Sequence, residues 1–376
     1  MVLRVDKVEP SQYLSFIENN PLGNFMQYPS WAEVKTEWEN ELLGWYSSDN
    51  ELVGCTLILL RKMPYLKRYL AYMPRGPILD WQKPQLADFL PPLLAYLKKK
   101  QVFNVIMDPP VVQAMWSTGT IKHALEHVKQ NNLNAKTFSD FEPDRMFTTG
   151  TTVQNQLATL GWQKMQPIAE FPVAQPEYVF RLSLQNQHLD DIFAGFHTNW
   201  RRNVKKSERL GVRVRIGTED DLQAFYDLLE VTAVRDKFKI RNYAYFANMY
   251  RVQKAEDPHR IFLYLAEDDQ EVLAATIAVF ANNHFWYLYG ASSNEKREKA
   301  PNHALQWQMI QDAYRLGAHT YDFRGISPTL DESNHLFGLL KFKLGFGGDA
   351  CEMIGAWEYP LQPCLRWAFE QYLKHR

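Results

Sequence analysis

The densest group of cationic side chains lies in NWRRNVKKSERLGVRVRIG, residues 199–217. The pattern predicts a helix that stops before Gly211 and is followed by an alternating strand. One side of that helix carries two pairs of cations at a spacing of four residues: Arg201, Arg202, Lys205 and Lys206. An anionic partner relieves their mutual repulsion, and the phosphates of a tRNA are one such partner. A solvated basic face explains the run equally well, so both interpretations stay open.

A second polar cluster is DKFKIRNYAYF, residues 236–246. Arg241 offers a planar fork that fits two phosphate oxygens at once. The hydroxyls of Tyr243 and Tyr245 can orient sugar or peptide groups beside it. The alternative is an exposed helix start whose tyrosines pack into the core, and taken alone this alternative is the better interpretation.

A third candidate is LLKFKLGFGGDA, residues 339–350, where Lys341 and Lys343 flank Phe342 before a glycine turn. A lysine that projects into a cleft places a fixed cation there. Beside a carbonyl, such a cation stabilises the oxyanion that forms during acyl transfer. The alternative is an ordinary strand with surface lysines, which the residues alone favour.

One metal pattern is present, since His123, Glu126 and His127 match H-x-x-E-H. The match stands alone in a polar helical stretch with no obvious third ligand, so we expect no metal. Neither G-x-x-x-x-G-K-[ST] nor G-x-G-x-x-G occurs, and we therefore expect no nucleotide cofactor. The cysteines are too few and too widely spaced for a disulfide framework or a zinc site: Cys55, Cys351 and Cys364.

The composition is that of a chain with substantial cores, because 46% of its 376 residues are hydrophobic. Lys and Arg number 42 against 43 Asp and Glu, which gives a net charge of −1. This balance excludes a whole-protein field that attracts nucleic acid but allows a local basic patch. The first residues contain no signal-like apolar stretch, and no run could span a membrane. We expect a soluble protein of the cytoplasm, and a monomer.

The elements that position these candidates repeat along the chain. The first half predicts a strand hairpin, a strand, a helix and a closing strand: residues 44–60, 67–80, 86–100 and 102–109. The second half predicts the same order: residues 261–280, 284–293, 302–316 and 319–326. Asp108 and Asp322 come near the ends of the two closing strands. We favour a genuine repeat over coincidence within a generic α/β pattern.

This order is also that of acetyltransferase (GNAT) domains. We therefore expect an α/β (α+β) fold with two GNAT-like domains, each a twisted mixed sheet flanked by helices. The predicted domains are residues 1–177, completed by 355–376, and residues 178–354. GNAT domains bind the coenzyme A pyrophosphate on a glycine-containing loop at a helix N-terminus. The equivalent stretches here, 81–87 and 296–304, contain no glycine, which favours another acyl donor.

Several short stretches, in their order and spacing, resemble the Fem-type (FemABX) peptidyl aminoacyltransferases: SWAEVK, RGPILD, NWRRNVKKSERLGV, YDFRGI and FKLGFGG. The resemblance spans nearly the whole chain. It implies two GNAT-like domains, aminoacyl-tRNA as donor and a muramyl pentapeptide precursor as acceptor. Only residues 206–241 lie between the basic helix and Arg241, so the long helical-hairpin insertion of larger members does not fit. The resemblance is therefore closest to the compact FemX-like branch.

The resemblance also implies roles for substrate-binding residues. Lys35 and Arg241 are similar to the pair that holds the diphosphate of the precursor. Asp108 is similar to an aspartate that contacts the precursor, and Tyr245 and Tyr289 to tyrosines of the acceptor channel.

For catalysis the resemblance implies Lys343, which follows Phe342, as the residue that stabilises the oxyanion. Phe103 stands where the family pattern has a tyrosine, so one hydroxyl contact to the acceptor is missing.

The expected function is tRNA-dependent transfer of an amino acid to the stem-peptide amine, a lysine side chain, of a peptidoglycan precursor. This reaction forms the bridge or branch of the peptidoglycan and needs no cofactor. The acceptor is UDP-MurNAc-pentapeptide or a lipid-linked precursor, and the latter implies peripheral association with a membrane. The alternatives are a CoA-dependent N-acyltransferase and a non-catalytic module that binds tRNA or precursor.

Overall fold

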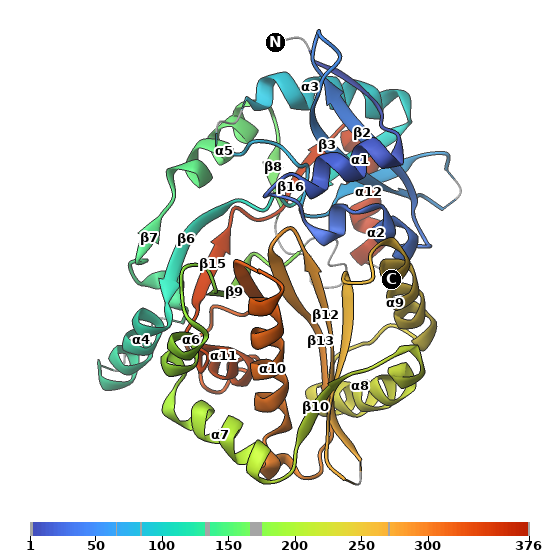
Figure 1. Ribbon diagram of the computed structural model, residues 1–376. Helices are drawn as coiled ribbons and strands as arrows, with labels where there is room; N and C mark the ends of the chain where they lie inside the picture. Colours follow the sequence, from blue (N-terminus) through green and yellow to red (C-terminus); the bar gives the residue numbers. More distant parts are fainter. Residues whose placement is uncertain are drawn as a thin grey trace. The chain divides into compact units, whose positions relative to one another are not determined.

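The computed structural model describes residues 3–64, 66–82, 85–131, 136–165, 175–269 and 271–374. The chain forms two compact units (Figure 1). Unit 1 comprises Met1–Met115, Asp144–Tyr178 and Cys351–Arg376, and unit 2 comprises Trp116–Pro143 and Val179–Ala350. The domain division expected from the sequence stays a prediction, and it differs from these units mainly over residues 116–143. Residues 83–84 of the expected loop 81–87 and residues 375–376 of the segment expected to complete the first domain lie outside the described residues.

Unit 1 is built on a mixed sheet in the order β1-β2-β3-β4-β5-β16-β8. Its strands are β1 (Arg4–Lys7), β2 (Glu39–Tyr46), β3 (Leu52–Lys62), β4 (Tyr69–Met73), β5 (Val102–Met107), β8 (Gln163–Lys164) and β16 (Trp357–Pro360). Its helices are α1 (Pro10–Glu18), the 3₁₀ turn η1 (Phe25–Gln27), α2 (Pro29–Val34), α3 (Leu86–Lys99), α5 (Thr148–Thr159) and α12 (Pro363–Lys374). The short strand β7 (Arg145–Met146) pairs with β6 (Val112–Ser117).

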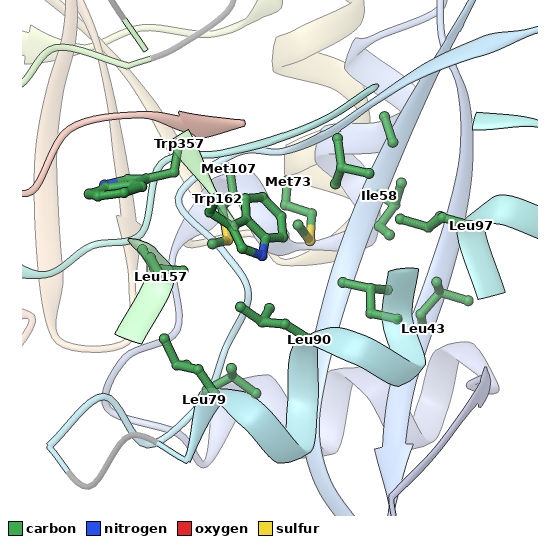
Figure 2. Close-up of a cluster of buried hydrophobic side chains, with 14 of the residues drawn as sticks. Leu43, Ile58, Met73, Leu79, Leu90, Leu97, Met107, Leu157, Trp162 and Trp357 are labelled. Carbon is green, nitrogen blue, oxygen red and sulfur yellow. The ribbon is translucent and has the colours of Figure 1, made fainter. Parts of the chain in front are cut away.

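Helix α3 shows why this sheet holds together. Its leucines at positions 86, 90, 93 and 97 recur at helical spacing, and all four are buried. They join a core that includes Trp45 of β2, Met107 of β5, Leu157 of α5 and Trp357 of β16, part of which Figure 2 draws. The helix continues through Pro91 and Pro92. A proline inside a helix costs about 3 kcal/mol, and each buried leucine returns roughly 1.5–3 kcal/mol.

Unit 2 contains six strands paired in the order β10-β11-β12-β13-β14-β9. They are β9 (Tyr178–Ser183), β10 (Arg213–Ile216), β11 (Ile261–Glu267), β12 (Val272–Ala281), β13 (His284–Ser292) and β14 (Thr320–Gly325). The helices are α4 (Thr118–Asn131), α6 (Leu189–Gly195), α7 (Thr198–Arg209), α8 (Leu222–Asp236), α9 (Tyr243–Glu256), α10 (Pro301–Arg315) and α11 (Phe337–Leu344). The 3₁₀ turns are η2 (Phe138–Asp140), η3 (Glu219–Asp221) and η4 (Arg297–Lys299). Three of the boundaries between the units fall inside strands, namely β6, β9 and β15 (Asp349–Met353).

The two units share one order of elements, as the sequence predicts. In unit 1, β2, β3 and β4 pair antiparallel, α3 follows, and β5 pairs parallel to β4. In unit 2, β11, β12 and β13 pair antiparallel, α10 follows, and β14 pairs parallel to β13. Helices α8 and α10 both pack against β12 and β13 (Figure 1). The mixed α/β fold class expected from the sequence is confirmed.

Candidate active site

The parallel strands β13 and β14 of unit 2 separate soon after they begin to pair. His284–Trp286 pair with Thr320–Asp322, but no pairing follows although β13 continues to Ser292 and β14 to Gly325. On its other side, β14 loses register with β9 between Asp322 and Gly325. Main-chain groups of β14 beyond Asp322 no longer pair with β13, although Gly325 pairs again with Val179 of β9, so other groups can bond to them on the β13 side.

Lys343 is a buried lysine that bonds to one of these released groups. Only 3% of its surface is exposed, and its Nζ donates to the Gly325 carbonyl oxygen at 2.7 Å. Burial lowers the pKa of Lys343 to about 7, although the Asp322 carboxylate raises it and the Arg324 guanidinium lowers it further. The segment is the helix α11 and not a strand with surface lysines. Lys341 of the same helix is exposed, so helical geometry sends the two lysines to different environments.

Asp322 is a buried carboxylate within the same group. Its Oδ2 accepts from Arg181 Nε at 3.0 Å and lies 3.3 Å from His284 Nε2. Its Oδ1 accepts from the backbone N–H of Arg324 at 2.7 Å. Burial by itself would raise the pKa of Asp322, but Arg181 first, then His284 and Arg324, hold that pKa well below its usual range. The carboxylate is therefore a fixed negative charge near Lys343.

Arg241, Tyr245 and Tyr289 form a contact chain that leads toward Lys343. The guanidinium carbon of Arg241 lies 5.5 Å from the centre of the Tyr245 ring, in a cation–π contact. The Tyr245 hydroxyl bonds to that of Tyr289, and burial raises the pKa of both. Arg324 lies near enough to Tyr289 to lower its pKa in turn. Three residues predicted from the sequence, Arg241, Tyr245 and Tyr289, thus lie together, and the charge of Arg324 acts on both Tyr289 and Lys343.

Phe342 contacts the basic helix α7. Its carbonyl oxygen accepts a bond from Trp200 Nε1 at 3.0 Å, and its ring meets the His303 ring edge-on at 5.3 Å. A Cβ on Gly345 would lie 2.1 Å from Trp200, so only glycine allows this packing. The His197 N–H also donates to the Gly345 carbonyl at 2.8 Å. The start of α7 is therefore fastened to the end of the helix that carries Lys343.

The remaining cations of α7 face outward to different extents. Val204 and Ser207 anchor the helix and are buried. Arg202 and Lys205 are exposed, whereas Lys206 is half-buried. Arg201 is also half-buried and donates to the Ala194 carbonyl and to Thr198 Oγ1. A tRNA-binding role for this face stays a prediction.

Lys35 belongs to unit 1, where it ends α2. Its Nζ lies 4.4 Å from the centre of the Trp31 ring. Its carbonyl accepts from the N–H of Trp38, whose ring centre lies 6.4 Å from that of Tyr72. A cation–π contact orients an ammonium without neutralising it, which suits a residue that binds an anion.

Asp108 is completely buried in unit 1, immediately after β5. Its Oδ1 accepts from the Arg75 N–H at 2.5 Å. Its Oδ2 accepts from the Tyr72 hydroxyl at 2.7 Å and from the Gln175 N–H at 2.6 Å. Burial raises the pKa of Asp108, although the Arg75 cation and these bonds lower it. Three groups of its own unit thus surround the carboxylate that the resemblance assigns to the precursor. Phe103 is buried as well, against Phe369 at 5.5 Å.

The histidines of the H-x-x-E-H match lie on α4. The rings of His123 and His127 stack at 6.0 Å, and the described part of the chain holds no group of three His, Cys, Asp or Glu side chains that could bind a metal ion.

Among the described residues, none of the helices combines the length and hydropathy that a membrane span requires.

The helix starts that would bind a pyrophosphate in GNAT domains each offer one backbone N–H fewer here. Helix α10 begins with Pro301, which has no N–H to offer. The N–H of Leu86, the first residue of α3, donates to the Gln156 side chain at 3.2 Å. Both features argue against acyl-CoA binding in the GNAT manner.

Sequence reasoning missed four residues of the group around Lys343: Arg181, Trp200, His284 and Arg324. One sequence signal pointed to this group. The stretch YDFRGI places Asp322 near the end of the second closing strand, as Asp108 is placed in the first repeat. No sequence pattern predicts the irregular pairing after Asp322. None predicts the hydrogen bond from the Trp200 indole to the main-chain carbonyl of Phe342 either.

Comparison with known proteins gives a consistent result. The chain is 25% identical over 426 residues to a lipid II:glycine glycyltransferase of Staphylococcus haemolyticus (strain JCSC1435), which covers 95% of this chain and 93% of that protein. The protein of the same name from Staphylococcus aureus (strain MRSA252) is also 25% identical, with the same coverage.

Solved structures with the same fold include a crystal structure of FemX, with a TM-score of 0.80 and 21% identity over 98% of this chain and 100% of that one. A tandem GNAT protein from the clavulanic acid biosynthesis pathway matches with a TM-score of 0.53 and 11% identity, over 96% of this chain and 98% of that one. The two sheets of this chain are thus GNAT-like. The FemAB family matches residues 8–256 and 262–375. The resemblance stated from the sequence is confirmed: the chain belongs to the FemAB family.

Proposed function

We propose that this chain is an aminoacyltransferase that moves an amino acid from aminoacyl-tRNA to the stem-peptide amine of a peptidoglycan precursor. The acceptor amine is a lysine side chain. The observation that carries the proposal is Lys343, a buried ammonium held at the point where β13 and β14 separate. The family and the glycyltransferase names of its relatives support this reaction class.

The reaction is the aminolysis of an ester. The neutral amine forms a C–N bond to the carbonyl carbon, a tetrahedral oxyanion follows, and the bond to the ribose oxygen of the tRNA breaks. The proton lost by the amine ends on that leaving oxygen. Lys343, when protonated, stabilises the oxyanion, a role typically worth about 10²–10³ in rate. The ester is already activated, so holding the two substrates in place supplies much of the remainder.

The acceptor amine must lose its proton before it attacks. A lysine amine has a pKa of about 10.4 in water. The surroundings of Tyr245 and Tyr289 favour the neutral form, because burial there penalises charge, as the raised pKa of both tyrosines indicates. Arg241 at the exposed end of this contact chain would bind the diphosphate of the precursor, as would Lys35.

A single-turnover assay tests the proposal. Labelled aminoacyl-tRNA is mixed with the protein and either UDP-MurNAc-pentapeptide or its lipid-linked form. Transfer of label to a pentapeptide supports the proposal, and the faster acceptor identifies the substrate. Binding of both substrates without transfer indicates a non-catalytic module. Thermal protection by acetyl-CoA, with no transfer from tRNA, indicates an N-acyltransferase instead.

The donor side has its own test on α7. Replacing exposed Arg202 and Lys205 with alanine should weaken binding of aminoacyl-tRNA and reduce the salt dependence of that binding. Each lost phosphate contact lowers the slope of log K against log salt by about 1. Arg251→Ala, which removes an exposed cation from α9, is the control. An unchanged slope in the double variant would show that the exposed cations of α7 form a solvated basic face and do not contact the tRNA.

A further inference from the structure

The carboxylate of Asp322 controls how β14 leaves the sheet. Asp322 is the last residue of β14 that pairs with β13, and it also pairs with Arg181 of β9. Only 1% of the Asp322 surface is exposed, and Oδ1 accepts a hydrogen bond from the backbone N–H of Arg324, two residues further on. This bond closes a short loop of main chain over the carboxylate. The strand cannot continue straight while the bond holds, which matches its lost register with β9.

The closed loop determines where the next carbonyl points. Arg324 has φ of +65°, a left-handed conformation that is uncommon for a residue with a side chain. Gly325 follows, and its carbonyl oxygen accepts Lys343 Nζ at 2.7 Å. A strand residue with ordinary φ at position 324 would direct this carbonyl elsewhere. One carboxylate, one backbone turn and one carbonyl therefore connect Asp322 to the ammonium of Lys343.

We infer that Asp322 is a positioning residue for Lys343, acting through the turn at Arg324 and the carbonyl of Gly325. The inference rests on the proposed function for its catalytic consequence, but not for its geometry. Asp322 itself need touch no substrate. Its bond to the Arg324 N–H keeps the Gly325 carbonyl at the place where it holds the lysine.

The same carboxylate also sets the charge around Lys343. Asp322 raises the pKa of Lys343, and the Arg324 guanidinium lowers it. Arg181 and His284, from β9 and β13, contact Asp322 directly. The other titratable groups of β9 and β13 are Tyr178, Tyr287 and Tyr289, and burial raises the pKa of Tyr287 and Tyr289. Burial lowers the pKa of His303 of α10 to about 4. Tyr287, Tyr289 and His303 are uncharged near pH 7, and the charges that act on Lys343 are Asp322 and Arg324.

Substitutions separate the geometric contribution from the charge. Asp322→Asn removes the charge but keeps an oxygen that can accept the Arg324 N–H. Asp322→Ala removes both. Arg324→Gly removes a cation while glycine adopts positive φ without strain. Arg181→Gln is the matched control, since it removes a partner of Oδ2 and leaves the Oδ1 bond intact.

Two readouts are needed for each variant. The first is the single-turnover rate of transfer against pH, together with the dissociation constant of the precursor. The second is the rate at which acetic anhydride labels Lys343, followed by mass spectrometry against pH. Labelling reports the titration of Lys343 whether or not transfer occurs.

We expect Asp322→Ala to lower the transfer rate by about 10- to 100-fold with nearly unchanged precursor affinity, because a misplacement of about 1 Å can cost that much. Asp322→Asn should stay within about 10-fold of the wild-type rate and move the Lys343 titration to lower pH, because an attractive charge is gone. Arg324→Gly should move it to higher pH. Arg181→Gln should leave it in place.

The inference fails if folded Asp322→Ala keeps the wild-type rate and titration. It also fails if Asp322→Asn and Arg324→Gly shift the titration of Lys343 in the same direction. If Asp322→Ala does not fold, the Asn and Gly variants decide alone. Absence of transfer in the wild-type protein refutes the proposed function, and the labelling experiment still tests the inference.

Discussion

The two units use the same order of strands but close their parallel pairs differently. In unit 1, β4 and β5 have one register shift, between Tyr69 and Leu70, and then stay paired to Met73 and Met107, the last residues of both strands. In unit 2, β13 and β14 pair over three residues and then separate. A continuous ladder consumes its main-chain donors and acceptors, whereas an interrupted one leaves them for other partners. Unit 2 therefore has a main-chain carbonyl available for Lys343.

The two aspartates near the ends of the closing strands also differ in their partners and in the direction of their pKa shifts. Asp108 is surrounded by a hydroxyl and two backbone N–H groups, and burial raises its pKa. Asp322 contacts Arg181 and His284, which hold its pKa low. The Asp108 carboxyl group is thus hydrogen-bonded by a hydroxyl and backbone N–H groups of unit 1. The Asp322 carboxylate is instead a negative charge paired with cationic side chains. A duplicated framework does not imply duplicated chemistry.

The largest expected effect concerns Lys343. Lys343→Met keeps the length of the side chain but removes the cation, so transfer should slow by about 10²–10³. Precursor affinity should change by less than about 2-fold, because the oxyanion exists only during the reaction. Single-turnover rates and precursor titrations measure both quantities.

The matched control is Lys341→Met, which alters an exposed lysine on the same helix. It should leave the rate unchanged. Equal losses of rate and affinity in Lys343→Met would contradict the assignment of oxyanion stabilisation to Lys343 of unit 2.

The next effect concerns binding of the precursor. Arg241→Ala should weaken precursor binding by about 10-fold or more, because charge-assisted bonds to phosphate are strong. Lys35→Ala tests the same anion-binding role from unit 1. Titration calorimetry with UDP-MurNAc-pentapeptide measures both, and Lys239→Ala is an exposed neighbouring control. Unchanged affinity in both variants would contradict the diphosphate role.

A smaller effect is expected at Trp200. Trp200→Phe keeps a ring against Gly345 but removes the bond from the indole N–H to the Phe342 carbonyl. We expect the free energy of unfolding to fall by about 1 kcal/mol and transfer to slow by about 5-fold. Urea denaturation and single-turnover rates measure the two. A stability loss with a wild-type rate would show that α7 does not influence Lys343.

The smallest effect is a difference in the pH dependence of stability. Asp322 has a lowered pKa, so its contribution is present above about pH 4 and is lost as the pH falls through its folded pKa. Asp108 has a raised pKa, so its ionisation costs stability as the pH rises above about 4. Relative to the wild type, the deficit of Asp322→Asn should grow by about 1–2 kcal/mol with rising pH, and that of Asp108→Asn should shrink.

Urea denaturation between about pH 3 and 7 measures this difference. Parallel curves for the two variants would mean that the two carboxyl groups have similar surroundings. The contrast between the units would then lie in their strand pairing alone.

Much of the framework was predictable from local patterns. Gly317 stops α10 with φ of +77°, and Gly211 follows α7 with φ of +79°, as their places after helical periodicity indicate. The strand hairpins of both halves and the closing strands near Asp108 and Asp322 also follow from alternation and turn residues. These features depend on neighbours in the chain, so a single sequence suffices to find them.

The segment around Lys343 was harder to predict. Its residues alternate between apolar and charged over a few positions, which suits a strand as well as a helix. The structure forms α11, in which Phe342 and Gly345 contact Trp200, a residue far away in the sequence. Tertiary packing thus overrode the local pattern.

The sequence by itself determined that the chain contains two similar halves and that Lys343 follows Phe342 before a glycine turn, because such patterns are written in adjacent residues. Only the tertiary structure decided that Lys343 is buried, that its pKa falls to about 7 and that Asp322 and Arg324 act on it. The physical reason is that burial and Coulomb interactions depend on distances in space. The interrupted pairing of β13 and β14 creates those distances.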